Sequence, residues 1–363
     1  MRGHANRNVV VAINEESGNL YSDPSVKFTI DQHDRGMYET AAEFLNHSDV
    51  GVVSVQHEYG IFGGEWGEYI LDFYRNSEKP LVTTFHTVLP DPPLKPQRIL
   101  RDLAKMSTSV VVAIESAANL LEELYGVERS KIRVVRHGVA LPDRMRNQYA
   151  KRQLGFQGRT ILATFGLISP GKGIEYAIRS LSYLVKERPD LLYLVIGETH
   201  PEVRRHDGEA YRDKLIALTK KINLQRNVRF IDNYLRDDQL SLYLQAVDVY
   251  LAPYLGKGQV SSGTLTLALG HGKAVVSTPT IFAKEVLSHE RGLLCKFAEA
   301  RSIATCVERI LSDLQLRKQL EANAFTYGQE VGWTKVADQY GDILRSITQS
   351  LRAFSETATI NQT

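Results

Sequence analysis

The chain has 363 residues, which is long enough for two domains, and its hydrophobic content of 43% can supply two packed cores. Its 44 basic and 42 acidic residues leave a net charge of +2, so there is no broad electrostatic case for nucleic-acid binding. No apolar run approaches the roughly 20 residues that a transmembrane helix needs. We therefore expect neither a nucleic-acid-binding protein nor a membrane-spanning one.

The N-terminal residues and the two cysteines indicate the expected cellular compartment. The first residues, Met1–Asn8, lack the apolar core of a signal peptide. Cys295 and Cys306 are the only cysteines, and their spacing fits neither a zinc site nor a redox pair. We expect two reduced thiols and a cytoplasmic protein.

Short β-rich runs alternate with helical patterns along the first part of the chain. The expected strands are 9–13, 50–55, 81–85, 110–113 and 132–135. The helical patterns between them are 41–46, 65–74, 97–106 and 117–125. Buried parallel strands joined by crossover helices produce this rhythm, so we predict an α/β, Rossmann-like domain over residues 1–140.

The second part of the chain repeats the rhythm after a polar stretch, and we predict a linker at 141–158. The expected strands that follow are 161–165, 191–196, 228–231, 249–251, 274–277 and 292–295. They predict a second Rossmann-like domain over 159–332, with a central cleft between the two domains. The last helical pattern, about 333–355, is too long for a crossover helix, and we expect it to pack back on the first domain.

Residues 166–173 join a strand-like run to a helical one and have the spacing G-x-x-x-x-G-K. This is the spacing of a P-loop, but Gly173 stands where Ser or Thr would hold magnesium, which disfavours a P-loop ATPase. After Gly166, Ser169 can cap the helix, and Lys172 can supply a charge to a phosphate. An ordinary strand-to-helix turn with a solvated lysine is the alternative.

A second loop, Gln259–Thr264, precedes an apolar helix. Ser262 and Thr264 offer hydroxyl groups, and Gly263 lets the backbone approach a ligand closely. The alternative is a simple capping motif. Two such loops in one domain, one of them with a lysine, suggest a diphosphate and hence a nucleotide-linked substrate.

Polar residues follow two neighbouring strands of the first domain. His57 and Glu58 come after one strand and are followed by Gly63 and Gly64, and His86 ends the next strand. The carboxyl ends of parallel strands are where α/β sheets bind ligands. A lone histidine there is more often structural, whereas two at neighbouring strand ends favour a site.

Other polar residues are weaker candidates for the cleft. His137 ends a strand just before the predicted linker, and Thr199 and His200 follow the strand at 191–196. A surface turn explains Thr199 and His200 equally well. The histidines form no close i, i+4 pair, so we expect no metal site.

Together these residues resemble the family-four glycosyltransferases of the GT-B fold, which are retaining and use nucleotide sugars. The resemblance covers nearly the whole chain. Its most specific pieces are HEYGIFGG at 57–64, TFHT at 84–87, RHGV at 136–139, FGLISPGKG at 165–173 and SSGTLTLALGHGKAVVSTP at 261–279.

The resemblance implies a retaining, metal-independent transfer of a hexosyl unit from a nucleoside diphosphate sugar to a hydroxyl acceptor, a saccharide or small molecule. No cofactor is expected besides this co-substrate. The implied roles place the diphosphate on Gly166, Lys172, Ser262, Gly263 and Thr264, the donor sugar on Gln259 and His137, and the reacting sugar and acceptor on His57, Glu58 and His86.

Three departures from the family pattern stand out. Leu167 replaces the usual arginine, and Gln259 and Leu267 stand where the family has paired glutamates. The family's first strand and glycine-rich loop are lacking, so we expect an incomplete first sheet whose edge invites a homo-oligomer. Two alternatives stay open: a glycoside phosphorylase of the same fold, and a truncated or degenerate sugar-nucleotide-binding module without activity.

Overall fold

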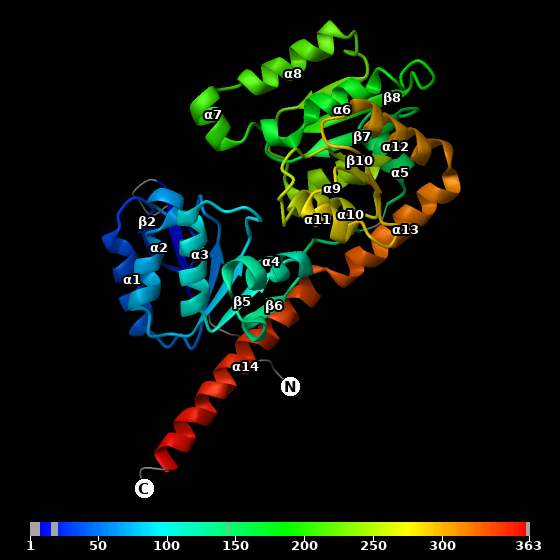
Figure 1. The fold of residues 1–363 in the computed structure, drawn as a ribbon. Helices are drawn as coiled ribbons and strands as arrows, with labels where there is room; N and C mark the ends of the chain where they lie inside the picture. Colours follow the sequence, from blue (N-terminus) through cyan, green and yellow to red (C-terminus); the bar gives the residue numbers. More distant parts are fainter. Residues whose placement is uncertain (1–7, 16–20, 144, 361–363) are drawn as a thin grey trace. The chain divides into compact units, whose positions relative to one another are not determined.

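The computed structural model describes residues 8–15, 21–143 and 145–360, with side chains to residue 350. Residues 1–7, on which much of the signal-peptide prediction rests, lie outside this range. The chain divides into two compact units, shown in Figure 1. Unit 1 comprises Met1–Arg136 and Ala337–Thr363, and unit 2 comprises His137–Val336.

Unit 1 contains two parallel sheets. Strand β1 (Val10–Asn14) pairs with β2 (Val26–Asp31) in a two-stranded sheet. A four-stranded sheet has the order β3 (Val53–His57), β4 (Leu81–Phe85), β5 (Ser109–Val112) and β6 (Ile132–Val134). Every residue of β4 and β5 is buried, as expected for strands covered on both faces. Strand β2 was not predicted, because its alternating polar residues do not form an apolar run.

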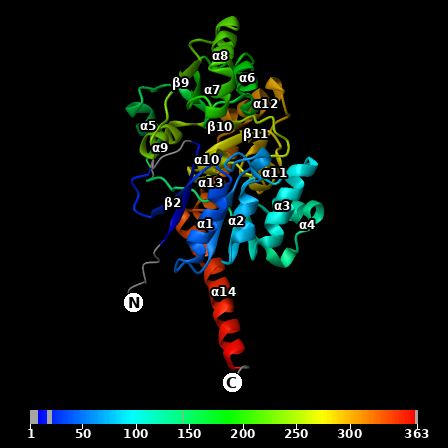
Figure 2. The ribbon, with the colours of Figure 1, turned by 90° about the vertical axis from the view of Figure 1, so that its left-hand side faces the viewer.

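Helices α1 to α4 of unit 1 pack side by side in chain order, as Figure 2 shows for α3 and α4. They are α1 (Gly36–Asn46), α2 (Ile70–Asn76), α3 (Leu94–Met106) and α4 (Glu115–Tyr125). The last helix, α14 (Trp333–Ile360), brings the Tyr340 hydroxyl to 3.0 Å from Thr84 Oγ1 on β4. The part of this long helix around Tyr340 thus contacts the four-stranded sheet of unit 1.

Unit 2 is built on a six-stranded parallel sheet of order β12-β11-β10-β7-β8-β9. Its strands are β7 (Thr160–Phe165), β8 (Leu191–Ile196), β9 (Val228–Ile231), β10 (Val249–Ala252), β11 (Ala274–Ser277) and β12 (Leu293–Leu294). Its helices are α5 (Asn147–Gln153), α6 (Ile174–Leu181), α7 (Pro201–Asp207), α8 (Ala210–Lys221), α9 (Asp237–Ala246), α10 (Gly263–Gly270), α11 (Ile281–Val286), α12 (Ala300–Ser312) and α13 (Leu314–Glu330). Because every residue of β8 is buried, the sheet is covered on both faces.

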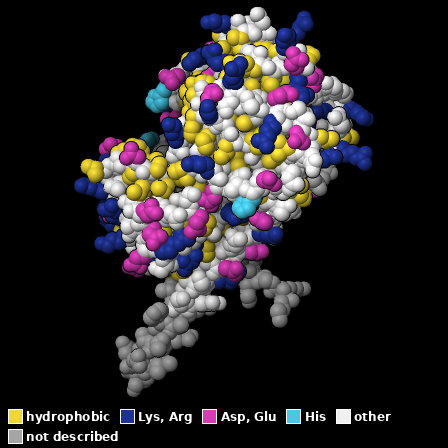
Figure 3. All heavy atoms as spheres, turned by 45° about the vertical axis from the view of Figure 1, so that its right-hand side comes forward, with side chains coloured by type: hydrophobic (Ala, Val, Ile, Leu, Met, Phe, Trp, Pro, Cys, Tyr) yellow, Lys and Arg dark blue, Asp and Glu magenta, His cyan; other side chains and the backbone are white. Residues whose placement is uncertain are grey.

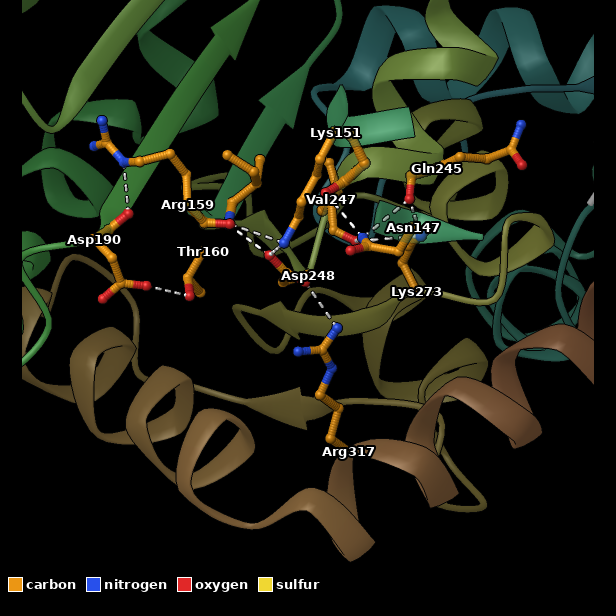
Figure 4. A network of polar contacts seen from close by, with 12 residues as sticks. Asn147, Lys151, Arg159, Thr160, Asp190, Gln245, Val247, Asp248, Lys273 and Arg317 are labelled. Atoms are coloured by element: carbon orange, nitrogen blue, oxygen red, sulfur yellow. Dashed lines mark hydrogen bonds and ion pairs between the residues drawn. The ribbon is translucent and has the colours of Figure 1, made fainter. Parts of the chain in front are cut away.

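The predicted linker at 141–158 differs from the structure, because α5 lies within it and belongs to unit 2. Figure 4 shows Lys151 of α5 beside Asp248, with Lys151 Nζ 2.5 Å from Asp248 Oδ2. Arg317 of α13 reaches the other carboxylate oxygen at 3.0 Å, and Asn147 donates to main-chain carbonyls at the C-terminal end of α9. Two of the polar residues that suggested a linker, Asn147 and Lys151, therefore take part in a network around the buried Asp248. Removing one partner of such a network is strongly destabilising.

The described surface carries charges of both signs. Figure 3 shows Lys and Arg side chains interspersed with Asp and Glu over the face that it displays, in keeping with the net charge of +2. No helix in the described part of the chain is both long and apolar enough to cross a bilayer.

Candidate functional site

The first loop of unit 2 lies against the end of the neighbouring strand. Gly166 follows β7 with φ of +116° and donates its N–H to the Ile196 carbonyl at 3.0 Å. Gly197, which follows β8, approaches so closely that a Cβ there would lie 2.2 Å from the Gly166 carbonyl oxygen. Both positions require glycine, for backbone conformation and for space.

The two loops of unit 2 converge around Gly166. A Cβ on Gly166 would lie 2.9 Å from Thr264 Cγ2 and 3.3 Å from Lys172 Nζ. Lys172 ends the short 3₁₀ helix η3 (Pro170–Lys172), and Thr264 lies in the first turn of α10. The structure thus brings together the lysine and the hydroxyl that the sequence placed in separate loops.

The N-terminus of α10 offers unpaired donors beside this lysine. Ser262 caps the helix, with its Oγ accepting from the Leu265 N–H at 3.2 Å. Within the described chain, the N–H groups of Gly263 and Thr264 have no hydrogen-bond acceptor. Free N–H groups and the positive end of the helix dipole favour an anion. Gly263 is exposed, so an anion could reach these groups from solvent.

Tyr254, which was not predicted from the sequence, links the two loops. Its ring lies under Lys172, with Nζ 5.0 Å from the ring centroid, and its hydroxyl lies 2.6 Å from Thr264 Oγ1 and 3.3 Å from Ser262 Oγ. Burial opposes ionisation of this phenol, but the Lys172 charge and the hydrogen bonds with Ser262 and Thr264 lower the pKa of Tyr254. A tyrosine separated from the end of β10 by Pro253 carries no motif, so only the three-dimensional contacts reveal its position.

Two predicted donor-sugar residues lie near the same helix end. His137 Nδ1 lies 2.8 Å from the Gly138 carbonyl oxygen, which can only accept, so Nδ1 donates a hydrogen bond to it. A Cβ on Gly263 would lie 3.3 Å from His137 Nε2, so this nitrogen faces the start of α10. Gln259 is half-buried, and its amide donates to the Ser261 carbonyl at 2.7 Å.

Thr199 does not line a cleft, which corrects the prediction. It is 1% exposed, and its hydroxyl is hydrogen-bonded to Glu209. His200 caps α7 by accepting from the Glu202 N–H at 3.2 Å. The main chain explains why both lie close to the first loop, because His200 N–H donates to the Ile168 carbonyl at 2.9 Å.

In unit 1, His57 is fully buried, which corrects its assignment as a group that faces substrate. Strand β3 continues to residue 57, so His57 shares the core-facing side of the strand with Val55. Its ring packs among Tyr59, Phe62 and Phe85, with centroid distances of 5.1, 5.6 and 5.4 Å, and neither ring nitrogen has a partner in the described chain. Burial, with a smaller contribution from His86, lowers the pKa of His57 to about 3.

Glu58 and His86 are held by hydrogen bonds at the carboxyl ends of β3 and β4. Thr87 Oγ1 donates to Glu58 Oε2 at 2.6 Å, and the Tyr59 N–H donates to Oε1 at 2.9 Å. His86 Nε2 lies 2.9 Å from Gln56 Oε1. Gln56 was not identified from the sequence, although it is a polar residue two positions before Glu58 on an alternating strand. Both predicted residues are half-buried and thus accessible in part.

The two glycines after Glu58 differ in accessibility. Gly63 is buried, and a Cβ there would lie 1.9 Å from the Gln32 carbonyl oxygen, so it serves packing and not a cleft, which corrects the prediction. Gly64 is exposed with φ of +81°. Among the described residues, no group of three His, Cys, Asp or Glu side chains is arranged to hold a metal ion.

Comparison with protein families gives a match to the family described as glycosyl transferases group 1, over residues 146–327. Among curated proteins, the phosphatidyl-myo-inositol mannosyltransferase of Mycolicibacterium smegmatis is 27% identical over 194 residues, which are 53% of this chain and 46% of that protein. The D-inositol 3-phosphate glycosyltransferase of Corynebacterium diphtheriae is 26% identical over 250 residues, 64% of this chain and 56% of that protein. The chain thus spans about half the length of these two relatives.

Solved structures resemble the chain over a larger share of its length. A glycosyltransferase from Rickettsia africae superposes with a TM-score of 0.74 at 17% identity, covering 93% of this chain and 90% of that one. Anabaena Alr3699/HepE in complex with UDP and glucose gives a TM-score of 0.70 at 16% identity, covering 86% and 82%. Similarity at these identities shows a shared fold.

Proposed function

Because the chain belongs to the glycosyl transferases group 1 family, we propose that it transfers a hexosyl unit from a nucleoside diphosphate sugar to a hydroxyl acceptor. The observation that carries this proposal is the convergence of Lys172, Thr264 and the unpaired N–H groups of α10 around Gly166. A cation, a hydroxyl and a helix N-terminus at one place match the needs of a diphosphate.

The donor diphosphate would lie on unit 2. Lys172 would donate to the phosphate next to the sugar, and the N–H groups of Gly263 and Thr264 would donate to its remaining oxygens. Tyr254 would hold Lys172 over its ring and orient the Thr264 hydroxyl. His137 Nε2 and Gln259 would accept or donate hydrogen bonds at sugar hydroxyls beside the start of α10.

The reaction that we propose retains the configuration at the anomeric carbon. The bond between that carbon and the phosphate oxygen breaks, and its electron pair stays on the phosphate. The acceptor oxygen then bonds to the same face of the sugar, and its proton passes to the departing phosphate oxygen. Lys172 and the helix end stabilise the charge that develops on this phosphate. His86, held by Gln56, would stabilise the donor sugar, and Glu58, held by Thr87, would orient the acceptor hydroxyl.

The proposed reaction needs neither a metal nor another cofactor. Lys172 and the backbone donors would neutralise the diphosphate in place of a metal ion. A cytoplasmic location and a homo-oligomer formed through a sheet edge stay predictions.

The test is a transfer assay with UDP-glucose, GDP-mannose and ADP-glucose in the presence of EDTA, with a panel of saccharides as acceptors. We expect one donor to release its nucleoside diphosphate with formation of a glycoside, whose anomeric configuration matches the donor in proton NMR. Release that needs a divalent metal would contradict the metal-independent mechanism, and an inverted product would contradict retention. No transfer from any of these donors, or phosphate-dependent cleavage of a saccharide without nucleotide, would contradict the transferase and favour the phosphorylase.

A further inference from the structure

Trp66 has an unusual backbone conformation at an accessible place in unit 1. It lies in the 3₁₀ helix η1 (Glu65–Gly67) with φ of 61° and ψ of 25°, the left-handed region that a bulky side chain rarely adopts. The residue is 38% exposed. Strained residues persist where their surroundings impose the conformation, and they concentrate at functional sites.

Two kinds of contact hold the segment Glu65–Glu68 that carries Trp66. Its ring packs edge to face on Tyr59, with centroids 5.6 Å apart and an interplanar angle of 87°, and Tyr59 is itself buried. The residues next to Trp66 in the chain are held as well, because Lys95 Nζ bridges Glu65 Oε2 at 2.7 Å and Glu68 Oε1 at 3.0 Å. The segment that carries Trp66 is thus fixed to α3, while the tryptophan itself stays partly open to solvent.

The groups around Trp66 indicate which ligand it suits. Glu58 and Glu65 both lie between the end of β3 and Trp66 in the chain, and the side chain of Glu65 is 69% exposed. Carboxylates accept hydrogen bonds from hydroxyl groups and repel anions, and Lys95 is already shared by two carboxylates. An aromatic ring with acceptors at its rim suits a ring-shaped, uncharged ligand that has an apolar face and hydroxyl groups at its edge.

We propose that Trp66 is the platform of an acceptor subsite, on which one pyranose ring of a neutral saccharide stacks while Glu65 accepts hydrogen bonds from its hydroxyls. This inference rests on the proposed transferase function and gives the class of its acceptor. It separates this chain from its relatives named D-inositol 3-phosphate glycosyltransferases, because the carboxylates of this subsite oppose a phosphorylated acceptor.

Binding can be measured without turnover, because the protein has only two tryptophans. In a Trp333→Phe variant, Trp66 is the sole indole fluorophore. We expect its emission to change saturably with millimolar neutral disaccharides such as maltose, cellobiose and mannobiose, and not with D-inositol 3-phosphate. A change with the inositol phosphate and none with the disaccharides would overturn the assignment of a neutral saccharide. No change with any of them would overturn the subsite.

Kinetics separate a binding platform from a merely structural residue. In the transfer reaction, Trp66→Ala should raise the acceptor KM at least ten-fold and leave the donor KM unchanged, while Trp66→Phe restores most of the affinity. Tyr234→Ala, which removes an aromatic residue that is 78% exposed in unit 2, is the matched control and should change neither value.

Stability supplies an independent readout. Trp66→Asn places a residue that tolerates the left-handed conformation, so it should raise the melting temperature while weakening acceptor binding. A lower melting temperature of Trp66→Asn together with an unchanged acceptor KM would show a structural role and overturn the proposal. If the transferase proposal is wrong and the subsite is right, the unaltered protein shows no transfer, but its fluorescence still changes with disaccharides.

Discussion

The two units carry their polar clusters in different ways. In unit 2, backbone groups dominate: the glycine approach at Gly166 and Gly197, the free N–H groups of α10, and one cation, Lys172. In unit 1, side chains hold one another at two strand ends, through the pairs Gln56–His86 and Glu58–Thr87. A backbone site recognises a group common to many substrates, whereas a side-chain site can be changed residue by residue. We infer that unit 2 supplies diphosphate binding and unit 1 supplies chemistry and acceptor choice.

The largest expected effect follows from breaking the backbone site. Gly197→Ala introduces a Cβ 2.2 Å from the Gly166 carbonyl at φ of +128°. We expect unit 2 to lose about 3 kcal/mol of unfolding free energy, measured by urea denaturation, because strain and overlap act together. The control is Gly256→Ala, where a Cβ meets no atom within 4 Å, and its stability should stay within about 0.5 kcal/mol. Equal stability of the two variants would contradict the close approach.

His86→Ala tests the side-chain site. We expect kcat to fall by about 100-fold while nucleotide affinity stays unchanged, because His86 belongs to unit 1 and the loops proposed to bind the diphosphate belong to unit 2. Steady-state kinetics and calorimetry on the same variant measure the two quantities. His47→Ala, at an exposed position of unit 1, controls for removal of a histidine. Unchanged turnover in His86→Ala would remove this residue from the mechanism.

The buried histidine of unit 1 predicts a dependence of stability on pH. His57 has a pKa of about 3 when folded, below the ordinary value of 6.5, so the unfolded chain binds the proton more readily. Its contribution is complete above pH 6.5 and falls by about 1.4 kcal/mol per pH unit as the pH drops toward 3. His57→Leu should flatten the acid side of the stability curve and leave turnover within about three-fold.

The matched control for this pH effect is His47→Leu, which replaces an exposed histidine of the same unit and should keep the slope of the unaltered protein. His271, whose burial lowers its pKa to about 4, should maintain part of the acid sensitivity in both variants. A slope in His57→Leu equal to that of the unaltered protein would contradict a neutral, buried His57.

The smallest effect concerns Tyr254, which connects the two loops of unit 2. Tyr254→Phe keeps the ring under Lys172 and removes the hydroxyl that contacts Thr264. We expect nucleotide affinity to fall roughly five-fold, in line with about 1 kcal/mol for one hydrogen bond. Tyr254→Leu should weaken binding further, because it also removes the ring. The control is Tyr183→Phe, at a residue 54% exposed. An affinity in Tyr254→Phe equal to that of the control would show that the hydroxyl does not position the loops.

Much of the fold followed from the sequence, because buried parallel strands form apolar runs that are easy to locate. Each predicted strand has a counterpart, and the similarity to solved structures confirms the predicted GT-B fold. The edge strand β2 and the helix α5 escaped prediction because their polar residues resemble loop sequence. In α5, Lys151 is stabilised by Asp248, a partner distant in sequence that no local pattern reveals.

The candidate site was only partly predictable. Loop motifs located Lys172 and Thr264, because glycines at strand ends mark places where backbone meets ligand. They could not show which way a residue at the end of a strand points. His57 illustrates this, since extending β3 by two residues turns its side chain into the core. Tyr254 and Gln56 act through contacts across the fold and carry no motif.

The most direct test of the central claim is a calorimetric titration of the unaltered protein and of Lys172→Ala with UDP, GDP and ADP, without added metal. We predict micromolar binding of one nucleotide and an affinity about 10- to 100-fold lower in Lys172→Ala, the loss expected for a charged hydrogen bond. Lys186→Ala, at an exposed lysine of unit 2, should bind like the unaltered protein. No binding of any nucleotide, or equal affinity in Lys172→Ala, would contradict a diphosphate site at the two loops.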